Sequence, residues 1–347
     1  KRTLHVDLIS TGQHEQMLQQ IFDFFSLSPD IHLKVMQPNQ TLSGLTALLI
    51  DKLQQCIDVG KYDMLIVQGD TTTAFVGALV GFYNKIPVYH IEAGLRTYDR
   101  NSPFPEEINR QLITRLATFH FAPTVRALKN LQLEGVENAH MVGNTVIDSL
   151  LMCIDRIKMH SDAYKEKYKI LDDYDSIILI TGHRRENFGK GFESICEAIR
   201  ALAVQYPATL FYYPVHLNPN VRNVVLNHLG GVKNVVLDEP ISYDELIYVM
   251  SRSKLILTDS GGIQEEGPTL NKPILVMRDT TERPEGIDAG CSKLVGTSTD
   301  VIIEEFTKLM GNPAYYQSMA NIENPYGDGS SSRKIADIIL GQSVGNG

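Results

Sequence analysis

The chain has 347 residues, of which 43% are hydrophobic and 21% charged, a composition typical of a globular protein with about two domains. Its formal net charge of −9 argues against nucleic acid or an anionic membrane as a partner. The four cysteines have no CxxC motif or histidine partner, so we expect free thiols and no metal site. No signal-peptide pattern opens the chain, and no apolar run reaches the roughly 20 residues of a membrane span. These features predict a cytoplasmic protein.

Strand-like and helix-like segments alternate along the first half of the chain. Strands are predicted at residues 4–10, 31–36, 64–67, 87–91 and 119–122, and helices at 13–25, 45–59, 72–83, 106–117 and 125–133. Residues 141–145 then lead into a helix at 146–158. Alternation of this kind predicts a parallel sheet with helices on both faces.

The polar stretch 160–175 reads as a linker, after which the alternation starts again. Further strands are predicted at 176–181, 209–214, 235–237, 255–258, 274–277 and 293–295, and further helices at 192–205, 221–229 and 243–253. Ser331 is a plausible N-cap for a last helix at 332–340. We expect two Rossmann-like α/β domains, residues 1–160 and 161–325, and a C-terminal helix within 326–347 that packs back toward the first domain.

Five polar segments follow apolar strands, at residues 69–73, 90–94, 182–187, 215–216 and 259–266. Ligands of parallel α/β sheets bind beyond the carboxyl ends of the strands. We therefore expect these segments to line a ligand site in a cleft between the two domains.

The segment LTDSGGIQEE, which ends at Glu266, predicts a phosphate site. A short buried strand leads into Ser260, Gly261 and Gly262, where glycines let the backbone approach an anion at a helix start. Glu265 and Glu266 lie one turn further on, where a carboxylate accepts hydrogen bonds from ribose hydroxyls. The alternative is a glycine-rich turn with a solvated acidic cap.

Carboxylates gather at strand and helix ends of the first half. Asp70 follows MLIVQG and is either a helix N-cap or a functional acid. Glu92 ends PVYHIE, where a buried carboxylate is costly unless it is paired or functional. Glu106 and Glu107 open a helix, where the dipole favours acids, and Arg110 is placed to pair with Glu106. Several carboxylates near one site favour general acid–base chemistry, because proximity and burial separate their pKa values.

Positive charge is expected from the second half. His183, Arg184 and Arg185 follow one strand, and Arg283 stands in TTERPE. Arginine suits bidentate phosphate recognition, and the alternative is that Arg184 and Arg185 are only salt-bridged surface residues. His216 is either a ligand or a core histidine that caps a turn.

Eight motifs carry a family resemblance, and in chain order they are VQGDTTTA, HIEAGLRT, PFPEEINRQ, GNTVIDSL, TGHRRENFGKGF, YPVHLNPNV, LTDSGGIQEE and RDTTERPE. They closely resemble the non-hydrolysing UDP-N-acetylglucosamine 2-epimerases, and with TGQH and NPYGDG the likeness spans nearly the whole chain. The resemblance implies a fold like that of glycosyltransferase family B, with UDP in the interdomain cleft. It also implies interconversion of UDP-N-acetylglucosamine and UDP-N-acetylmannosamine without a cofactor, in a homodimer that serves cell-surface polysaccharide biosynthesis.

The resemblance also implies roles for residues. In the family mechanism the C2 proton is removed, UDP leaves to give a 2-acetamidoglucal, and UDP re-adds with the proton on the opposite face. The acid–base carboxylates fall on Asp70, Glu92 and Glu106, with His183 near the leaving phosphate; which carboxylate serves which face stays open. Substrate-binding residues are expected at Arg110, Arg184, Ser260, Gly261, Gly262, Glu266 and Arg283. A second UDP-sugar that acts as activator would lie near Gln13, Gln40, Arg184, Glu107 and His216, although Asn39 replaces a basic residue common beside that region.

One departure concerns the start. Family members open with a strand and a GTRPE-type turn that brings an arginine and a lysine to the diphosphate, whereas this sequence starts at Lys1. We expect upstream residues in any well-folded sample, and a chain that truly begins at Lys1 should be poorly soluble and inactive.

Three other functions remain open. A hydrolysing 2-epimerase would release UDP and free N-acetylmannosamine, although GDTTT and IEAGLRT fit the non-hydrolysing pattern better. A family-B glycosyltransferase would share the nucleotide site. A UDP-sugar-binding regulator is disfavoured by the acidic cluster, because binding a diphosphate alone calls for basic residues.

Overall fold

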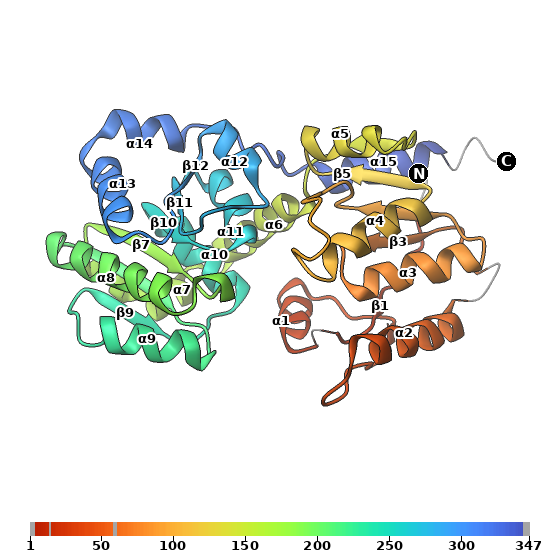
Figure 1. Cartoon of the computed structure of the whole chain (residues 1–347), viewed down its shortest axis with the longest axis horizontal. Helices are drawn as coiled ribbons and strands as arrows, with labels where there is room; N and C mark the ends of the chain where they lie inside the picture. The colour runs from red at the N-terminus through yellow and green to blue at the C-terminus, as the bar shows by residue number, and fades with distance from the viewer. Residues whose placement is uncertain (1–3, 14, 58–60, 343–347) are drawn as a thin grey trace. The chain divides into compact units, whose positions relative to one another are not determined.

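The computed structural model describes residues 4–13, 15–57 and 61–342, and the chain folds as two compact units (Figure 1). Unit 1 comprises Lys1–Thr145 and Gly329–Gly347, and unit 2 comprises Val146–Asp328. Every strand pair among the described residues is parallel, which confirms the predicted α/β class with Rossmann-like sheets.

In unit 1, one parallel sheet has the strand order β3-β4-β5-β6, and β1 pairs with β2. The strands are β1 (Ile9–Ser10), β2 (Ile31–His32), β3 (Leu65–Gln68), β4 (Val88–Ile91), β5 (Phe119–Ala122) and β6 (Ala139–Met141). The helices are α1 (Glu15–Phe25), α2 (Leu42–Cys56), α3 (Thr72–Tyr83), α4 (Glu106–Leu116), α5 (Val125–Leu133) and α15 (Ser331–Gln342).

Helix α3 packs very closely on its sheet. A Cβ atom added at Gly81 would lie 2.6 Å from Cγ2 of Val88, and one added at Gly77 would lie 3.0 Å from Cγ1 of Val67. Only glycine fits at Gly81 without a shift of its neighbours, since real Cβ atoms do not approach so near. This packing fixes the start of α3 at the carboxyl end of β3, where Asp70 stands.

Unit 2 contains a six-stranded parallel sheet with the order β12-β11-β10-β7-β8-β9. Its strands are β7 (Ser176–Thr181), β8 (Thr209–Pro214), β9 (Val235–Asp238), β10 (Leu255–Thr258), β11 (Ile274–Val276) and β12 (Ser292–Leu294). Its α-helices are α6 (Thr145–Met159), α7 (Ser161–Lys167), α8 (Lys190–Gln205), α9 (Pro219–Leu229), α10 (Tyr243–Arg252), α11 (Gly261–Glu266), α12 (Pro284–Ala289), α13 (Thr299–Gly311) and α14 (Pro313–Ala320), with short 3₁₀ turns η1 (Lys169–Asp173), η2 (Arg185–Asn187) and η3 (Gly267–Leu270).

The strand order of unit 2 locates its ligand edge. The chain runs from β7 outward to β8 and β9 on one side, and returns through β10 to β11 and β12 on the other. The point where the order reverses therefore lies between β7 and β10, which pair directly from Leu255 with Ile178 to Thr258 with Thr181. Crevices at such switch points are where open parallel sheets bind ligands. The loops after β7 and β10 are the segments that begin at Gly182 and Asp259.

Several predicted elements differ from the structure. The predicted strand 4–10 is reduced to Ile9–Ser10, because only these two residues find a ladder partner, in β2. The predicted linker 160–175 is largely helical, and the division after Thr145 precedes the boundary placed after residue 160. Helices α12, α13 and α14 were not predicted. Within the predicted helices 13–25 and 45–59, residues 14, 58 and 59 lie outside the described part of the chain.

Helix α15 belongs to unit 1. Its Ile335 and Ile339 are buried in one cluster with Tyr89 of β4, Phe121 of β5 and Val142. The chain therefore returns to its first sheet after unit 2 is complete. Among the described residues, no helix has the length and apolar character needed to span a membrane.

Candidate active site

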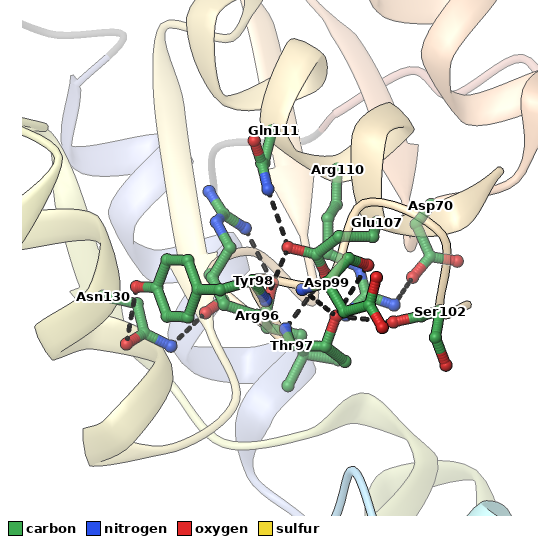
Figure 2. A network of polar contacts seen from close by, with 12 residues as sticks. Asp70, Arg96, Thr97, Tyr98, Asp99, Ser102, Glu107, Arg110, Gln111 and Asn130 are labelled. Carbon is green, nitrogen blue, oxygen red and sulfur yellow. Dashed lines mark hydrogen bonds and ion pairs between the residues drawn. The ribbon is translucent and has the colours of Figure 1, made fainter. Parts of the chain in front are cut away.

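Asp70 projects from the turn between β3 and α3. The N-cap of α3 is Thr71, whose hydroxyl accepts a hydrogen bond from the backbone N–H of Ala74 at 3.3 Å. Asp70 is therefore not the cap, and its Oδ2 lies 2.7 Å from Nη2 of Arg110 (Figure 2). The amide of Asn109 donates to the Asp70 carbonyl at 2.9 Å. Helix α4 thus holds both the backbone and the carboxylate of Asp70.

Glu107 is a buried carboxylate that contacts both Arg110 and the loop before α4 (Figure 2). It is 0% exposed, and its carboxylate accepts from the backbone N–H groups of Thr97 at 3.0 Å and Tyr98 at 3.2 Å. It also accepts from Nε2 of Gln111 at 2.7 Å and faces Nη1 of Arg110 at 3.4 Å. These contacts leave no surface for the predicted contact with an activator, so Glu107 organises the loop before α4.

Arg110 also differs from its predicted role. It is only 6% exposed, and its two Nη atoms face Asp70 and Glu107, not Glu106. The guanidinium therefore contacts two protein carboxylates and orients Asp70. Glu106, the first residue of α4, is half-buried at the same end of the helix.

Glu92 lies beside the Asp70 turn. It follows β4 with a left-handed φ of 64°, and its Oε2 is 3.6 Å from where a Cβ on Gly69 would stand. The turn is held to β4 by two contacts, from the Gly69 N–H to the Ile91 carbonyl at 3.0 Å and from Nε2 of His90 to the Gly69 carbonyl at 2.8 Å. Burial lowers the pKa of His90 to about 3, so the ring is neutral and donates this bond. The adjacent strands β3 and β4 therefore present Asp70 and Glu92 together.

Asp259 organises the switch point of unit 2. It is 0% exposed, and its Oδ2 accepts from the backbone N–H groups of His183 at 2.9 Å and Arg184 at 2.8 Å. The amide of Asn187 approaches the same oxygen at 3.4 Å. A residue at the end of β10 thus folds the loop after β7 into place. The sequence signal for this role is the acid that directly precedes the small-residue turn.

His183 reaches out of this loop. Its ring stacks on His216, with centroids 5.3 Å apart and planes at 16°. Burial lowers the pKa of His183, against the opposing effect of Asp259, whose Oδ1 lies 3.8 Å from Nδ1. The structure therefore places the two predicted histidines together.

Two arginines converge on the start of α11. A Cβ at Gly261 would lie 3.8 Å from Nη2 of Arg184 and 3.8 Å from Cζ of Arg283. Ser260 is the N-cap, with its N–H donated to Thr258 Oγ1 at 2.9 Å. Gly262 follows in the first turn of α11. Two guanidinium groups above a glycine turn form an environment suited to a diphosphate.

The two acids of α11 have different environments. Glu265 is ion-paired with Nε of Arg283, which orients that arginine. Glu266 is 4% exposed and accepts a hydrogen bond from the Tyr243 hydroxyl at 2.8 Å. Burial raises the pKa of Glu266 to about 7, although the hydrogen bond from Tyr243 works in the opposite direction. Glu266 therefore keeps acceptor capacity near the turn, whereas Glu265 is committed to Arg283.

The remaining predicted positions, Gln13, Gln40 and His216, make local hydrogen bonds within their units. In unit 1, Gln13 accepts a hydrogen bond from the Thr73 hydroxyl at 2.6 Å, and Gln40 donates to the Val35 carbonyl at 3.2 Å. In unit 2, Nδ1 of His216 accepts from the backbone N–H of Asn218 at 3.0 Å. His216 thus caps a turn, as one of the two sequence interpretations predicted, but it is exposed and is not a core residue, and its ring contacts His183.

Comparison with known proteins decides the family. The family profile described as UDP-N-acetylglucosamine 2-epimerase matches residues 1–340. The chain belongs to the UDP-N-acetylglucosamine 2-epimerase family. A relative of that name from Neisseria meningitidis is 48% identical over 334 residues, which cover 95% of this chain and 90% of the relative.

Solved structures of 2-epimerases agree with this membership. The crystal structure of UDP-GlcNAc 2-epimerase from Neisseria meningitidis, bound to UDP-GlcNAc, superposes with a TM-score of 0.91 at 46% identity and covers 98% of this chain and 93% of its own. That of the Methanocaldococcus jannaschii 2-epimerase, in complex with UDP-GlcNAc and UDP, gives a TM-score of 0.79 at 32% identity, with 94% and 89% covered. The predicted family and the glycosyltransferase-B-like fold are thereby confirmed, and the hydrolysing alternative is not favoured.

Proposed function

We propose that this epimerase interconverts UDP-N-acetylglucosamine and UDP-N-acetylmannosamine by eliminating and re-adding UDP. The residue assignment rests on Asp70 and Glu92, which lie together at the ends of β3 and β4. Arg110 pairs with Asp70, and Glu92 has a left-handed backbone conformation. Two carboxylates at neighbouring strand ends supply a base and an acid for proton transfer at one carbon.

In the proposed reaction, one carboxylate removes the C2 proton, the C1–O bond breaks, and its electron pair leaves with UDP. This step yields a 2-acetamidoglucal. UDP then attacks C1 again, while a carboxylate on the opposite face delivers a proton to C2. Asp70, Glu92 and Glu106 are the groups we assign to these transfers. Arg110 keeps Asp70 oriented throughout.

We assign the uridine diphosphate to unit 2. Ser260, Gly261 and Gly262 form the turn at the start of α11, where Gly261 and Gly262 offer backbone N–H groups, and Arg184 and Arg283 flank Gly261 with positive charge. Arginine forks match phosphate oxygens, and such donors stabilise the charge that develops as UDP departs. His183 lies in the loop beside Arg184, where its imidazole donates a hydrogen bond to the departing phosphate. Glu266 accepts hydrogen bonds from the ribose hydroxyls.

We further propose a cytoplasmic homodimer whose product serves the synthesis of cell-surface polysaccharide. The buried free thiols Cys153, Cys196 and Cys291 fit a reducing compartment, which supports the location. Gln13, Gln40, Arg184 and His216 remain our proposed contacts for an activating second UDP-sugar. Saturation of the rate with a Hill coefficient above 1 would support that proposal, and hyperbolic saturation would refute it.

The test of the proposed function is incubation with UDP-N-acetylglucosamine in deuterated water, followed by proton NMR. We expect deuterium at C2 of both epimers, appearance of the manno epimer and little free UDP. Stoichiometric release of UDP with free sugar would instead establish the hydrolysing reaction. No exchange at C2 would refute epimerisation.

A further inference from the structure

Arg278 is a buried cation held by two carboxylates of unit 2. It follows β11, and its side chain is 3% exposed. Its Nε lies 2.5 Å from Oε1 of Glu186 and its Nη2 lies 3.3 Å from Oε2 of the same residue. On the other side, Nη1 lies 2.7 Å from Oε2 of Glu282, and Nη2 lies 3.2 Å from Oε1. The guanidinium thus uses both of its edges in bidentate contacts.

The two carboxylates belong to the two segments that carry the diphosphate arginines. Glu186 stands two residues after Arg184, in the loop that follows β7, and Glu282 directly precedes Arg283. These segments are far apart in the sequence, and Arg278 joins them through one side chain. The guanidinium groups of Arg184 and Arg283 both lie close to Gly261.

The bridge makes four hydrogen-bond contacts, two to each segment. Burial raises the pKa of Glu282, but hydrogen bonds and charge from Arg278 outweigh this and bring it to about 2. Charge-assisted bidentate contacts of a planar guanidinium are stronger and more directional than those of an ammonium group. Asn187 adds a further tie, since its amide donates to the Met277 carbonyl, next to Arg278, at 3.0 Å.

We propose that Arg278 is a positioning residue that sets the spacing of Arg184 and Arg283 for the diphosphate, without itself contacting substrate. The inference rests on the proposed binding of UDP to this turn. Two guanidinium groups on separate loops hold one diphosphate well only if the distance between them is set before binding, because ordering them on binding costs affinity.

The test compares Arg278→Met, Arg278→Lys and the triple change Arg278→Met, Glu186→Gln and Glu282→Gln. Arg252→Met is the control, because Arg252 also pairs with an acid of unit 2, Asp172, but stands at the end of α10, before β10, on the amino side of the sheet. For each protein we would measure UDP affinity by calorimetry, kcat and KM, and the free energy of unfolding.

We expect Arg278→Met to weaken UDP binding by about 10–100-fold and to lower kcat, since misplacement by about 1 Å can cost 10²-fold. Arg278→Lys should recover little, because a compact ammonium group cannot reproduce two bidentate contacts with carboxylates. The triple variant should regain stability, since no buried charge is left unpaired, yet bind UDP as weakly as Arg278→Met. Arg252→Met should bind UDP like the wild type.

The outcomes separate the two proposals. A wild-type protein that fails to bind UDP would refute the proposed function before Arg278 is tested. If the wild type binds UDP and the folded triple variant or Arg278→Lys binds equally well, Arg278 only stabilises the fold and the inference is wrong. Should Arg278→Met fail to fold, these two variants still decide the question.

Discussion

Nη2 of Arg110 lies 2.7 Å from Oδ2 of Asp70, while Nη1 of the same guanidinium lies 3.4 Å from Oε2 of the fully buried Glu107. One cation therefore joins a proposed acid–base residue to a carboxylate that also binds the backbone of Thr97 and Tyr98. The orientation of Asp70 thus depends, through Arg110, on the buried Glu107 near the start of α4. This relationship makes Arg110 an orienting residue, and it leads to a first prediction.

Arg110→Met should lower both kcat and stability. Removing the guanidinium leaves the charge of Glu107 buried without its cation, and breaking a buried pair in this way typically costs about 3–5 kcal/mol of unfolding free energy. Urea unfolding and steady-state kinetics at a temperature where the variant is folded would measure the two effects. A raised KM with unchanged kcat would contradict this and assign Arg110 to substrate binding.

Asp70→Asn, Glu92→Gln and Glu106→Gln should each lower turnover by about 10²–10⁴-fold, because general acid–base groups typically supply that much. UDP should bind each variant as it binds the wild type, since its proposed contacts lie in unit 2. Exchange at C2 in deuterated water, measured in both directions, would show which carboxylate serves which epimer. Near-normal turnover of Glu92→Gln would show that Glu92 is structural.

Glu266 should make stability depend on pH. Its pKa is raised by burial from 4.5 to about 7 in the folded protein, so it binds its proton more tightly folded than unfolded. Its contribution to stability is therefore fully present below pH 4.5 and is lost as pH rises through 7, by up to about 3 kcal/mol. Glu266→Gln should remove this slope from urea unfolding measured between pH 4.5 and 8.

Tyr243→Phe provides the matched control for Glu266. Loss of the 2.8 Å hydrogen bond removes a contact that favours the ionised carboxylate, so the decline in stability should start at the same pH but extend to higher pH. Identical pH slopes in the wild type and Glu266→Gln would show that Glu266 titrates normally.

His90 should be replaceable by glutamine but not by leucine. The neutral ring donates to the Gly69 carbonyl at 2.8 Å and so holds the turn that carries Asp70. Glutamine retains a donor of similar reach, whereas leucine leaves the carbonyl unpaired, and kcat should fall by up to about 10²-fold. UDP affinity should not change. Equal loss of kcat in both variants would mean that the hydrogen bond is not what matters.

Local signals in the sequence predicted the elements well. The helix Thr72–Tyr83 and the strands Phe119–Ala122, Ser176–Thr181 and Leu255–Thr258 begin and end as expected, because turn residues flank clear apolar runs. The polar segments at strand ends also identified the residues from which the candidate site is built. These features depend on chemistry within a few neighbouring residues.

Long-range partners were not predictable in the same way. Arg110 was expected to pair with Glu106, since helix rules consider only nearby positions, but the fold brings in Asp70 from another element. The bridge from Arg278 to Glu186 likewise joins segments that no local pattern relates. Such pairings follow from strand order, which places the loops after β7, β10 and β11 along one edge.

Helix α15 has a consequence for biosynthesis. Ile335 and Ile339 complete the apolar cluster around Tyr89 and Phe121, although all of unit 2 lies between them in the sequence. On the ribosome, unit 2 is therefore fully translated while that face of β4 and β5 still lacks its cover. Exposed apolar surface on incomplete domains promotes aggregation, so unit 1 is vulnerable until α15 emerges. Most of unit 1 is thus translated before unit 2 but can complete its core only after unit 2 has been made.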